Sequence, residues 1–363
     1  MSDLASHLAA WDRRALSLPP ELVARLLTPA LVVRLDVVRH NVGVILEQLG
    51  GDANRWRPHL KTTKLPRVWE LLLDADVRAF KVATTREAAR LLELLDARDL
   101  IGDVLVAYPH VGPALERLGQ LARQHPRQRL SVLVEDVAGV AAAPPSLGLF
   151  VDVNPGMDRT GRPLADADGL FGVARACGER LGGLHVYDGH LHHADEDQRR
   201  AAVHAGYDRV VALLDGWRGQ GLALDEVISA GTPAFPAAAV YDGLGDRVSP
   251  GTVVFHDLRG AEENPGLALA PAAVVAARVV SQPAPGVVTL DAGSKALAAE
   301  AGDPCARVLG RPELRPRTPS EEHLPCEGPP AALPPRGTLL QLVPRHVCPT
   351  VNLADEAVLL DEG

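Results

Sequence analysis

Short apolar runs alternate with helical patterns over roughly the first 230 residues of the chain. Helical periodicity fills the segments between the runs, most clearly over residues 37–49, 86–95, 113–124 and 197–217. The apolar runs are residues 30–35, 55–60, 79–83, 104–108, 130–134, 147–153, 184–187 and 227–230. Eight such runs separated by helices predict an α/β fold, a parallel (β/α)₈ barrel of the TIM type.

A doubly wound open sheet is the competing architecture for this pattern. Such sheets often carry a glycine-rich phosphate loop directly after the first strand. Here the first run leads into Asp36-Val37-Val38, and no glycine-rich turn follows it. The sequence therefore favours the barrel.

The pattern changes after Ala230, where the helical segments give way to loops rich in proline and glycine. Strands are predicted over residues 248–255, 272–280, 286–291 and 337–343, without a strong helix between them. We therefore predict an N-terminal lead-in over residues 1–28, with helical spacing in 18–27. The barrel is expected over residues 29–244, and an appended C-terminal all-β domain over 245–363.

Composition narrows the class of protein. A length of 363 residues suits a large domain with a smaller one, and a net charge of −9 argues against nucleic acid as a partner. No stretch of eighteen apolar residues occurs, so no membrane span or membrane partner is expected. Met1-Ser2-Asp3-Leu4 does not open a secretory signal, which favours a cytoplasmic location. The four cysteines lack a disulfide-framework spacing, as expected of a reducing compartment.

Polar side chains follow four of the predicted strands at their C-terminal ends, where a barrel carries its reactive groups. The loops after the last two predicted strands are the usual phosphate-binding position, and backbone amides near glycine suit an anion there. In chain order, the candidates are His59 and Lys61, Arg159, Tyr187 and His190, and Gly231 with Thr232.

A lysine at a strand end can remain solvated, as most lysines do, or it can become a nucleophilic amine that forms a Schiff base. Arg159 alone could cap a helix, and Gly231-Thr232 alone could be an ordinary turn. Together with Lys61 and Tyr187 on one rim, these groups are what a phosphorylated aldehyde cofactor requires. The combination predicts a site for pyridoxal phosphate.

A further candidate site lies near the C-terminus. On an extended segment, His346 and Cys348 would point the same way and share one metal, leaving positions open for water or substrate. The alternative is a buried thiol beside a surface imidazole. Two interpretations are open for the segment Ser320-Glu321-Glu322-His323: it adds an acid–base pair to the site, or it is a surface loop without a chemical role.

Taken together, these motifs resemble those of the D-threonine aldolase and eukaryotic-type D-serine dehydratase family, a fold-type III group of pyridoxal phosphate enzymes. The resemblance covers nearly the whole chain. It implies an alanine-racemase-like barrel with a C-terminal β domain, Lys61 as the Schiff-base lysine, a divalent metal held by His346 and Cys348, and a homodimer. The matching motifs are Arg57-Pro58-His59-x-Lys61-Thr62-x-Lys64, residues 152–161, Tyr187-Asp188-Gly189-His190, Gly231-Thr232-Pro233, residues 249–252, residues 291–296, residues 320–323 and His346-x-Cys348-Pro349-Thr350.

Two positions depart from the family pattern. Thr63 stands where the family usually has histidine, and Cys348 stands where its aldolases often have aspartate. An oxygen ligand suits manganese or magnesium, whereas the thiolate of Cys348 suits zinc, as in the dehydratase branch. The loop Tyr187-Asp188-Gly189-His190, in contrast, is closer to the aldolase branch.

The resemblance implies a lyase that acts on small D-amino acids with a β-hydroxyl group. If His190 or a metal-bound hydroxide takes the hydroxyl proton, Cα–Cβ cleavage gives glycine and an aldehyde. If Lys61 takes the Cα proton instead, elimination gives a keto acid and ammonia. His59, beside Lys61, is a further catalytic candidate.

More distant alternatives are a non-catalytic pyridoxal phosphate carrier, which needs no metal segment, and a racemase. A racemase typically requires a second base, a tyrosine from the β domain. All four tyrosines of this chain precede that domain, which counts against racemisation.

Overall fold

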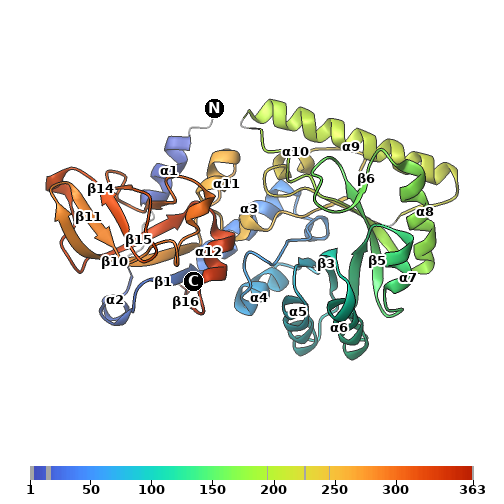
Figure 1. Ribbon diagram of the computed structural model, residues 1–363, viewed down its shortest axis with the longest axis horizontal. Helices are drawn as coiled ribbons and strands as arrows, with labels where there is room; N and C mark the ends of the chain where they lie inside the picture. The colour runs from blue at the N-terminus through green and yellow to red at the C-terminus, as the bar shows by residue number, and fades with distance from the viewer. Residues whose placement is uncertain (1–3, 14–17, 194, 225, 245, 362–363) are drawn as a thin grey trace. The chain divides into compact units, whose positions relative to one another are not determined.

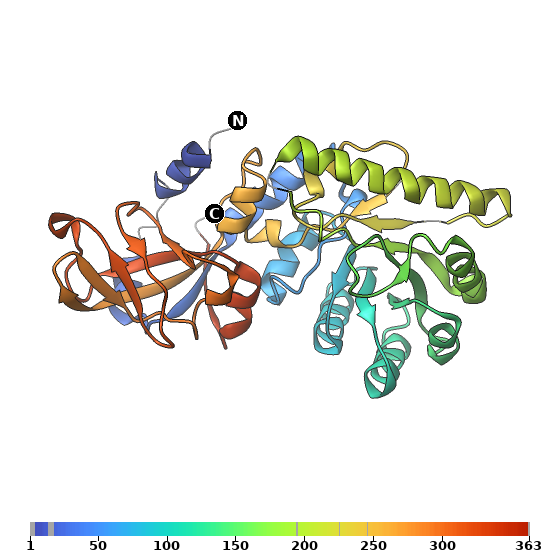
Figure 2. The same ribbon diagram turned by 45° about the horizontal axis from the view of Figure 1, so that its top comes forward.

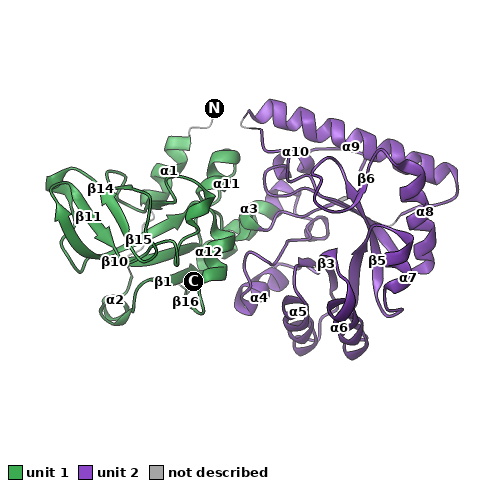
Figure 3. Cartoon of the chain, in the orientation of Figure 1, with its two compact units in different colours: residues 1–45, 252–363 green, residues 46–251 purple. Residues whose placement is uncertain are grey.

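The computed structural model describes residues 4–13, 18–193, 195–224, 226–244 and 246–361. The chain divides into two compact units (Figure 3). Unit 1 takes in the chain up to Ile45 and from Thr252 onward, and unit 2 runs from Leu46 to Gly251. Among the described residues, no helix has both the length and the apolar character that crossing a membrane requires.

Unit 2 is built on a parallel sheet with the strand order β2-β3-β4-β5-β7-β8-β9. Parallel bridges join Trp56 to Val248 in β9 and His59 to Lys81 in β2. The segment 56–59 therefore lies between the first and last strands and closes the sheet into a barrel of eight strands. The strands are β2 (Ala79–Val82), β3 (Asp103–Pro109), β4 (Arg129–Val134), β5 (Gly148–Asn154), β7 (Leu181–Val186), β8 (Val227–Ser229) and β9 (Asp246–Val248), with the short β6 (Arg162–Pro163) beside β5.

Helices line the outside of this sheet (Figures 1 and 2). Several begin with a side-chain cap just after a strand-end loop, which satisfies a backbone N–H that the helix itself leaves unpaired. Thr84, Asp136 and Asp195 each accept a hydrogen bond from the amide three residues on. The helices are α4 (Pro66–Asp74), α5 (Thr85–Ala97), α6 (Gly112–Gln124), α7 (Val137–Ala142), α8 (Ala167–Cys177), α9 (Glu196–Gly219) and α10 (Phe235–Ala239), with 3₁₀ turns at Ala53–Arg55 and Gly178–Arg180.

Unit 1 is built on an antiparallel sheet with the strand order β12-β15-β10-β11-β14-β13, beside which β1 pairs with β10 and β16 pairs with β1. Apolar residues from these strands form a buried core, including Val275, Leu290 and Leu342. The strands are β1 (Ala30–Arg34), β10 (Ala273–Ala284), β11 (Val287–Leu290), β12 (Ala306–Val308), β13 (Arg315–Pro316), β14 (Leu324–Glu327), β15 (Leu339–Pro344) and β16 (Ala357–Leu360). The helices here are α1 (Leu4–Arg13), α2 (Pro20–Arg25), α3 (Leu35–Gln48, which crosses the boundary), α11 (Leu258–Glu263) and α12 (Val347–Leu353), with 3₁₀ turns at Thr252–Val254, Ala299–Ala301 and Pro330–Ala332.

The predicted barrel with an appended β domain is confirmed as a fold class, but one strand was assigned to the wrong sheet. The run 30–35, predicted to open the barrel, contains β1, in which Leu31 pairs with Val275 of β10. The eighth barrel strand is instead β9, whose three residues are too short for a periodic signal. Consequently Lys61 follows the first barrel strand, and Gly231 follows the seventh.

The boundaries between the units also differ from the predicted ones. The units divide at residues 45/46 and 251/252 rather than at 28/29 and 244/245. The predicted strand over 248–255 consists of the last residue of β9, a loop and a 3₁₀ turn. Two short helices, α11 and α12, lie in the region that was expected to be all-β.

Candidate active site

Lys61 lies in a turn at the C-terminal end of the first barrel strand. The turn is tied to β2, because the Leu60 amide donates to the Lys81 carbonyl at 2.7 Å. Lys61 is exposed, and its ammonium forms no hydrogen bond or ion pair within the part of the chain that the structure describes. Lys64 differs, since its ammonium lies 3.4 Å from Glu87 Oε1. Of the two lysines in the motif, Lys61 is therefore the one available for chemistry.

His59 accompanies Lys61 as predicted. The Lys61 amide donates to His59 Nδ1 at 3.3 Å, so this nitrogen carries the lone pair. Burial, together with the nearby ammonium groups of Lys61 and Lys81, holds the pKa of His59 well below its usual value. His59 is therefore a neutral imidazole beside the lysine.

Tyr187 brings together the other predicted rim residues of unit 2. The guanidinium carbon of Arg159 lies 4.7 Å from the centroid of the Tyr187 ring, a cation–π distance. Two glycines make room for the ring: a Cβ on Gly189 would lie 2.4 Å from Tyr187 Cε1, and one on Gly231 would lie 3.0 Å from Cε2. Arg159, Tyr187 and Gly231 thus form one cluster, and Thr232 follows directly in the chain.

Asp188 fixes the two loops that make this cluster. Its carboxylate accepts from the Gly231 amide at 2.9 Å and from the Tyr207 hydroxyl at 2.7 Å. The side chain is buried, and burial raises the pKa of Asp188 above its usual value, although both hydrogen bonds oppose that rise. The strand-end loops after β7 and β8 are therefore joined by a carboxyl group that the sequence analysis had quoted only as part of a motif.

His190 lies against the loop that follows β5, because a Cβ on Gly156 would meet His190 Nε2 at 3.5 Å. Its Nδ1 atom is buried and has no hydrogen-bond partner among the described residues. A buried ring nitrogen without a partner suits a ligand that supplies one. This observation, with the unpaired ammonium of Lys61, fits the binding of a polar cofactor and substrate at this rim.

A group of residues that the sequence analysis did not predict lies inside the barrel: Lys81 in β2, His185 in β7 and Asp152 in β5. Lys81 Nζ is 2.9 Å from His185 Nε2, and His185 Nδ1 is 2.7 Å from Asp152 Oδ1. All three side chains are almost fully buried. A signal was present, since a lysine in the middle of an apolar parallel strand faces a buried environment on either side of the sheet.

The structure does not support the extended segment expected at His346-x-Cys348. His346 is the N-cap residue of α12, and Cys348 lies in the first turn of that helix. Cys348 is half-buried with its Sγ 3.3 Å from Thr252 Oγ1, and Asp257 anchors the turn by accepting from the Val347 amide at 2.9 Å. An imidazole and a thiol are donors that suit zinc. Within the described ranges, no three or more His, Cys, Asp or Glu side chains are grouped as a metal site.

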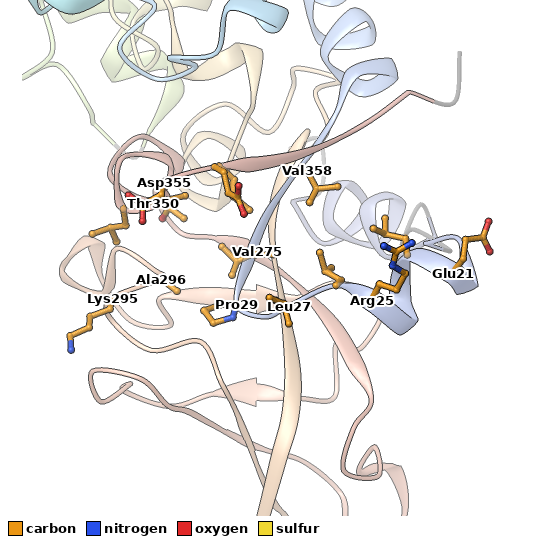
Figure 4. Close-up of a pocket in the computed structure, with 17 residues that line it drawn as sticks. Glu21, Arg25, Leu27, Pro29, Val275, Lys295, Ala296, Thr350, Asp355 and Val358 are labelled. Carbon is orange, nitrogen blue, oxygen red and sulfur yellow. The ribbon is translucent and has the colours of Figure 1, made fainter.

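Two other features of unit 1 carry none of the predicted chemistry. Glu321 and Glu322 form exposed ion pairs with Lys295 Nζ at 2.8 and 2.9 Å, so the segment 320–323 is a surface turn. A groove of about 1030 Å³ runs beside Leu27, Pro29 and Val275 (Figure 4). Its lining is mostly apolar with charged groups at the margin, and it includes no candidate site residue.

Comparisons with protein families agree with this division of the chain. Residues 33–258 match the alanine racemase N-terminal domain, and residues 272–360 match the putative serine dehydratase domain. The first match covers the whole parallel barrel, and the second covers most of the antiparallel sheet. The two matches therefore correspond to the alanine-racemase-like barrel and to the β domain that the resemblance implied.

Individual relatives span almost the entire chain. A D-threonine aldolase of Arthrobacter sp. is 31% identical over 373 residues, covering 96% of this chain and 94% of the relative. A 3-hydroxy-D-aspartate aldolase of Paracoccus denitrificans (strain Pd 1222) is 26% identical and covers 100% and 95%. The crystal structure of D-threonine aldolase from Filomicrobium marinum matches with a TM-score of 0.83 at 27% identity, covering 93% and 92%. The chain therefore belongs to the D-threonine aldolase family of alanine-racemase-like proteins, which are fold-type III pyridoxal phosphate enzymes.

Proposed function

We propose that this protein is a pyridoxal phosphate-dependent lyase that cleaves D-amino acids carrying a β-hydroxyl group, giving glycine and an aldehyde. The observation that carries the proposal is the exposed ammonium of Lys61 at a barrel strand end, which has no hydrogen-bond or ion-pair partner among the residues that the structure describes. Relatives that span nearly the whole chain support the substrate class, since they are named for D-threonine and 3-hydroxy-D-aspartate.

Each rim residue has a proposed role toward the cofactor. Lys61 would bind its aldehyde carbon, Arg159 and Tyr187 would position its ring, and the loop at Gly231 and Thr232 would hold its phosphate. When bound, pyridoxal phosphate supplies an electron sink for negative charge at the substrate Cα. The shape of the Tyr187 cluster, which Gly189 and Gly231 keep open, supports this assignment.

The remaining roles concern the β-oxygen of the substrate. We propose that His190 accepts the hydroxyl proton, because its buried Nδ1 atom has no partner among the described residues. His346 and Cys348 would hold a divalent metal, preferably zinc, with manganese or magnesium as alternatives; a metal there supplies positive charge for an oxygen ligand. His59, a neutral imidazole whose Nδ1 accepts from the Lys61 amide, would orient the turn that carries the reactive amine.

Dehydration is the second candidate reaction. It is favoured by the match of residues 272–360 to the putative serine dehydratase domain and by the soft sulfur donor of Cys348. In that reaction Lys61 would take the Cα proton, and the products would be a keto acid and ammonia. Racemisation has less support, because all four tyrosines lie in unit 2 and none is offered by the β domain.

The reaction can be identified from its products. Purified protein with pyridoxal phosphate and a divalent metal is incubated with D-threonine and with D-serine. Acetaldehyde and glycine would support aldol cleavage, whereas pyruvate and ammonia would support dehydration. Neither pair of products, in the presence of cofactor and metal, would defeat both reactions. The visible absorption of the bound cofactor should be lost in Lys61→Ala.

We further propose that the protein acts as a homodimer in a reducing cytoplasm. The family resemblance supports the dimer, and the four cysteines, which form no disulfide with one another, are compatible with a reducing compartment. Sedimentation equilibrium of the purified chain tests the first point, since a mass near 38.5 kDa would mean a monomer.

A further inference from the structure

The buried group Lys81, His185 and Asp152, here called the Lys81 triad, forms one hydrogen-bonded chain across the barrel interior. Asp152 Oδ1 accepts from His185 Nδ1 at 2.7 Å, so His185 Nε2 carries the lone pair. Lys81 Nζ lies 2.9 Å from that Nε2 atom and donates to it. The direction of both hydrogen bonds is therefore fixed, and it suits a charged Lys81 as well as a neutral one.

The triad lies directly beside the predicted cofactor cluster. Lys81 Nζ is 5.5 Å from the centroid of the Tyr187 ring, and the His185 and Tyr187 rings are parallel with centroids 6.4 Å apart. Lys81 is also joined through the backbone to the turn that carries Lys61, since its carbonyl accepts from the Leu60 amide. The triad thus connects the interior of the barrel to the reactive rim.

Opposing charges act on the Lys81 amine from several elements. Burial and the positive charges of Lys61 and Arg57 disfavour its protonated form, whereas the carboxylates of Asp152 and Asp188 favour it. The neutral groups that face it are His59, His185 and Tyr187. The result is a pKa of about 7 for Lys81, so this amine exchanges a proton near neutral pH. Burial and the Lys81 ammonium together lower the pKa of His185 to about 4, which keeps the imidazole neutral.

We propose that the Lys81 triad is the proton acceptor that allows Lys61 to become a neutral, nucleophilic amine. The proposal rests on the proposed role of Lys61 as the cofactor lysine. A proton leaves Lys61 Nζ and is bound at Lys81 Nζ, where His185 and Asp152 stabilise the ammonium, and no other bond changes. Loss of the charge on Lys61 also removes the repulsion that opposes the charge on Lys81, so the two changes favour each other.

A first experiment measures the coupling without any cofactor. The titration of Lys81 is followed by NMR of protein labelled with ¹³C at the lysine ε-carbon, and Lys81→Met assigns the signal. In Lys61→Gln, which removes the charge on residue 61, the Lys81 midpoint should rise by about one pH unit. An unchanged midpoint would overturn the proposal. Lys295→Met, an exposed lysine of unit 1, is the control and should leave the midpoint unchanged.

A second experiment follows the rate at which visible absorbance develops when pyridoxal phosphate is added to the cofactor-free protein. At pH 7, Lys81→Met should load at least tenfold more slowly than the wild type, because Lys61 has lost its acceptor. At pH 10 hydroxide in solution can act as the proton acceptor in place of Lys81, and the two rates should converge. A merely structural role for Lys81 would slow loading equally at both values of pH and would contradict the proposal.

The two experiments separate this proposal from the proposed function. If the wild type develops no visible band but Lys61→Gln still shifts the Lys81 titration, the cofactor assignment fails and the coupling stands. If the wild type loads cofactor and Lys81→Met loads at the same rate at pH 7, the cofactor assignment stands and the role of the triad is refuted. Asp152→Asn should slow loading less than Lys81→Met does, since it removes only the carboxylate that stabilises the charge.

Discussion

A fully buried cation occupies the start of the barrel's first strand. The Arg57 guanidinium donates from Nε and Nη2 to the two Glu226 carboxylate oxygens at 2.8 and 3.0 Å, and from Nη1 to Asp103 Oδ1 at 3.0 Å. Its side chain has no exposed surface. Burying a charge is costly unless it is paired, and here the two carboxylates are supplied by the N-terminal ends of β3 and β8. Arg57 is therefore a structural residue, although it belongs to the same motif as Lys61.

Removing that cation should destabilise the barrel. In Arg57→Met, Glu226 loses two charge-assisted hydrogen bonds, although Arg247 still donates to it at 2.8 Å. We expect the free energy of unfolding to fall by about 3 kcal/mol. Urea unfolding followed by circular dichroism measures the change. Arg127→Met is the matched control, since Arg127 pairs with Asp99 at the exposed surface, and it should change little. Equal effects of the two variants would contradict this account.

Gly189 should be intolerant of even one added methyl group. In Gly189→Ala the Cβ would lie 2.4 Å from Tyr187 Cε1, so the ring must shift from the position in which it contacts Arg159. We expect the affinity for pyridoxal phosphate to fall about tenfold or more, measured by a fluorescence titration. Gly216→Ala is the control, because a Cβ there meets nothing within 4 Å and alanine suits the interior of α9. Wild-type affinity in Gly189→Ala would show that the position of the ring is unimportant.

Single residues show where sequence reasoning succeeded and where it stopped. The positions of Lys61, Arg159 and Tyr187 at the strand ends of the barrel could be predicted, because the apolar runs mark where each strand ends; their roles stay predictions. Lys81 and His185 were missed because each is surrounded by apolar residues within its run. Their pairing depends on which strands face each other across the barrel, and periodicity along the chain does not contain that information.

At the scale of elements, helix α1 packs on an unusual histidine of unit 1. The His256 ring centroid lies 5.3 Å from that of Trp11 and 5.9 Å from that of His7. His256 is 1% exposed, and neither ring nitrogen has a hydrogen-bond partner among the described residues. Burial, with His7 nearby, lowers the pKa of His256 to about 3. The histidine is therefore held neutral, as an aromatic packing group.

This arrangement predicts sensitivity to acid. The folded-state pKa lies below the unfolded value of 6.5, so the stability is complete above pH 6.5 and is lost as the pH falls toward 3. His256→Phe keeps an aromatic ring but cannot take a proton. Between pH 7.5 and pH 5, its free energy of unfolding should fall by about 2 kcal/mol less than that of the wild type. Parallel pH profiles from urea unfolding would contradict the buried, neutral state of His256.

The sheet to which a strand belongs could not be predicted for β1. β1 has the same continuous apolar run as a barrel strand. A strand whose two faces are both buried has this sequence pattern in a parallel sheet and in a mixed sheet alike. Its partners β10 and β16 lie more than 200 residues away in the sequence. The local pattern therefore identified the strand correctly and could not identify its sheet.

At the scale of the whole molecule, unit 1 is assembled from both ends of the chain. β1 supplies Leu31, Val32 and Val33, which are buried and lie between β10 and β16. The Asn41 side chain in α3 adds a further tie, because it donates to the Ala270 carbonyl at 2.8 Å and accepts from the Ala270 amide at 2.9 Å. The C-terminal segment alone therefore lacks a central strand of its own sheet.

Fragments of the chain test this topology. We expect residues 46–251, which contain all eight barrel strands, to fold alone with a cooperative urea transition. Residues 252–363 should aggregate or remain unfolded, because the edges of β10 and β16 would lie exposed where β1 belongs. Coexpression with residues 1–45 should restore a soluble, folded complex, and Val32→Asp in the shorter fragment should prevent that rescue. A stable, monomeric fragment 252–363 would mean that the β domain is complete without β1, as the sequence pattern alone had predicted.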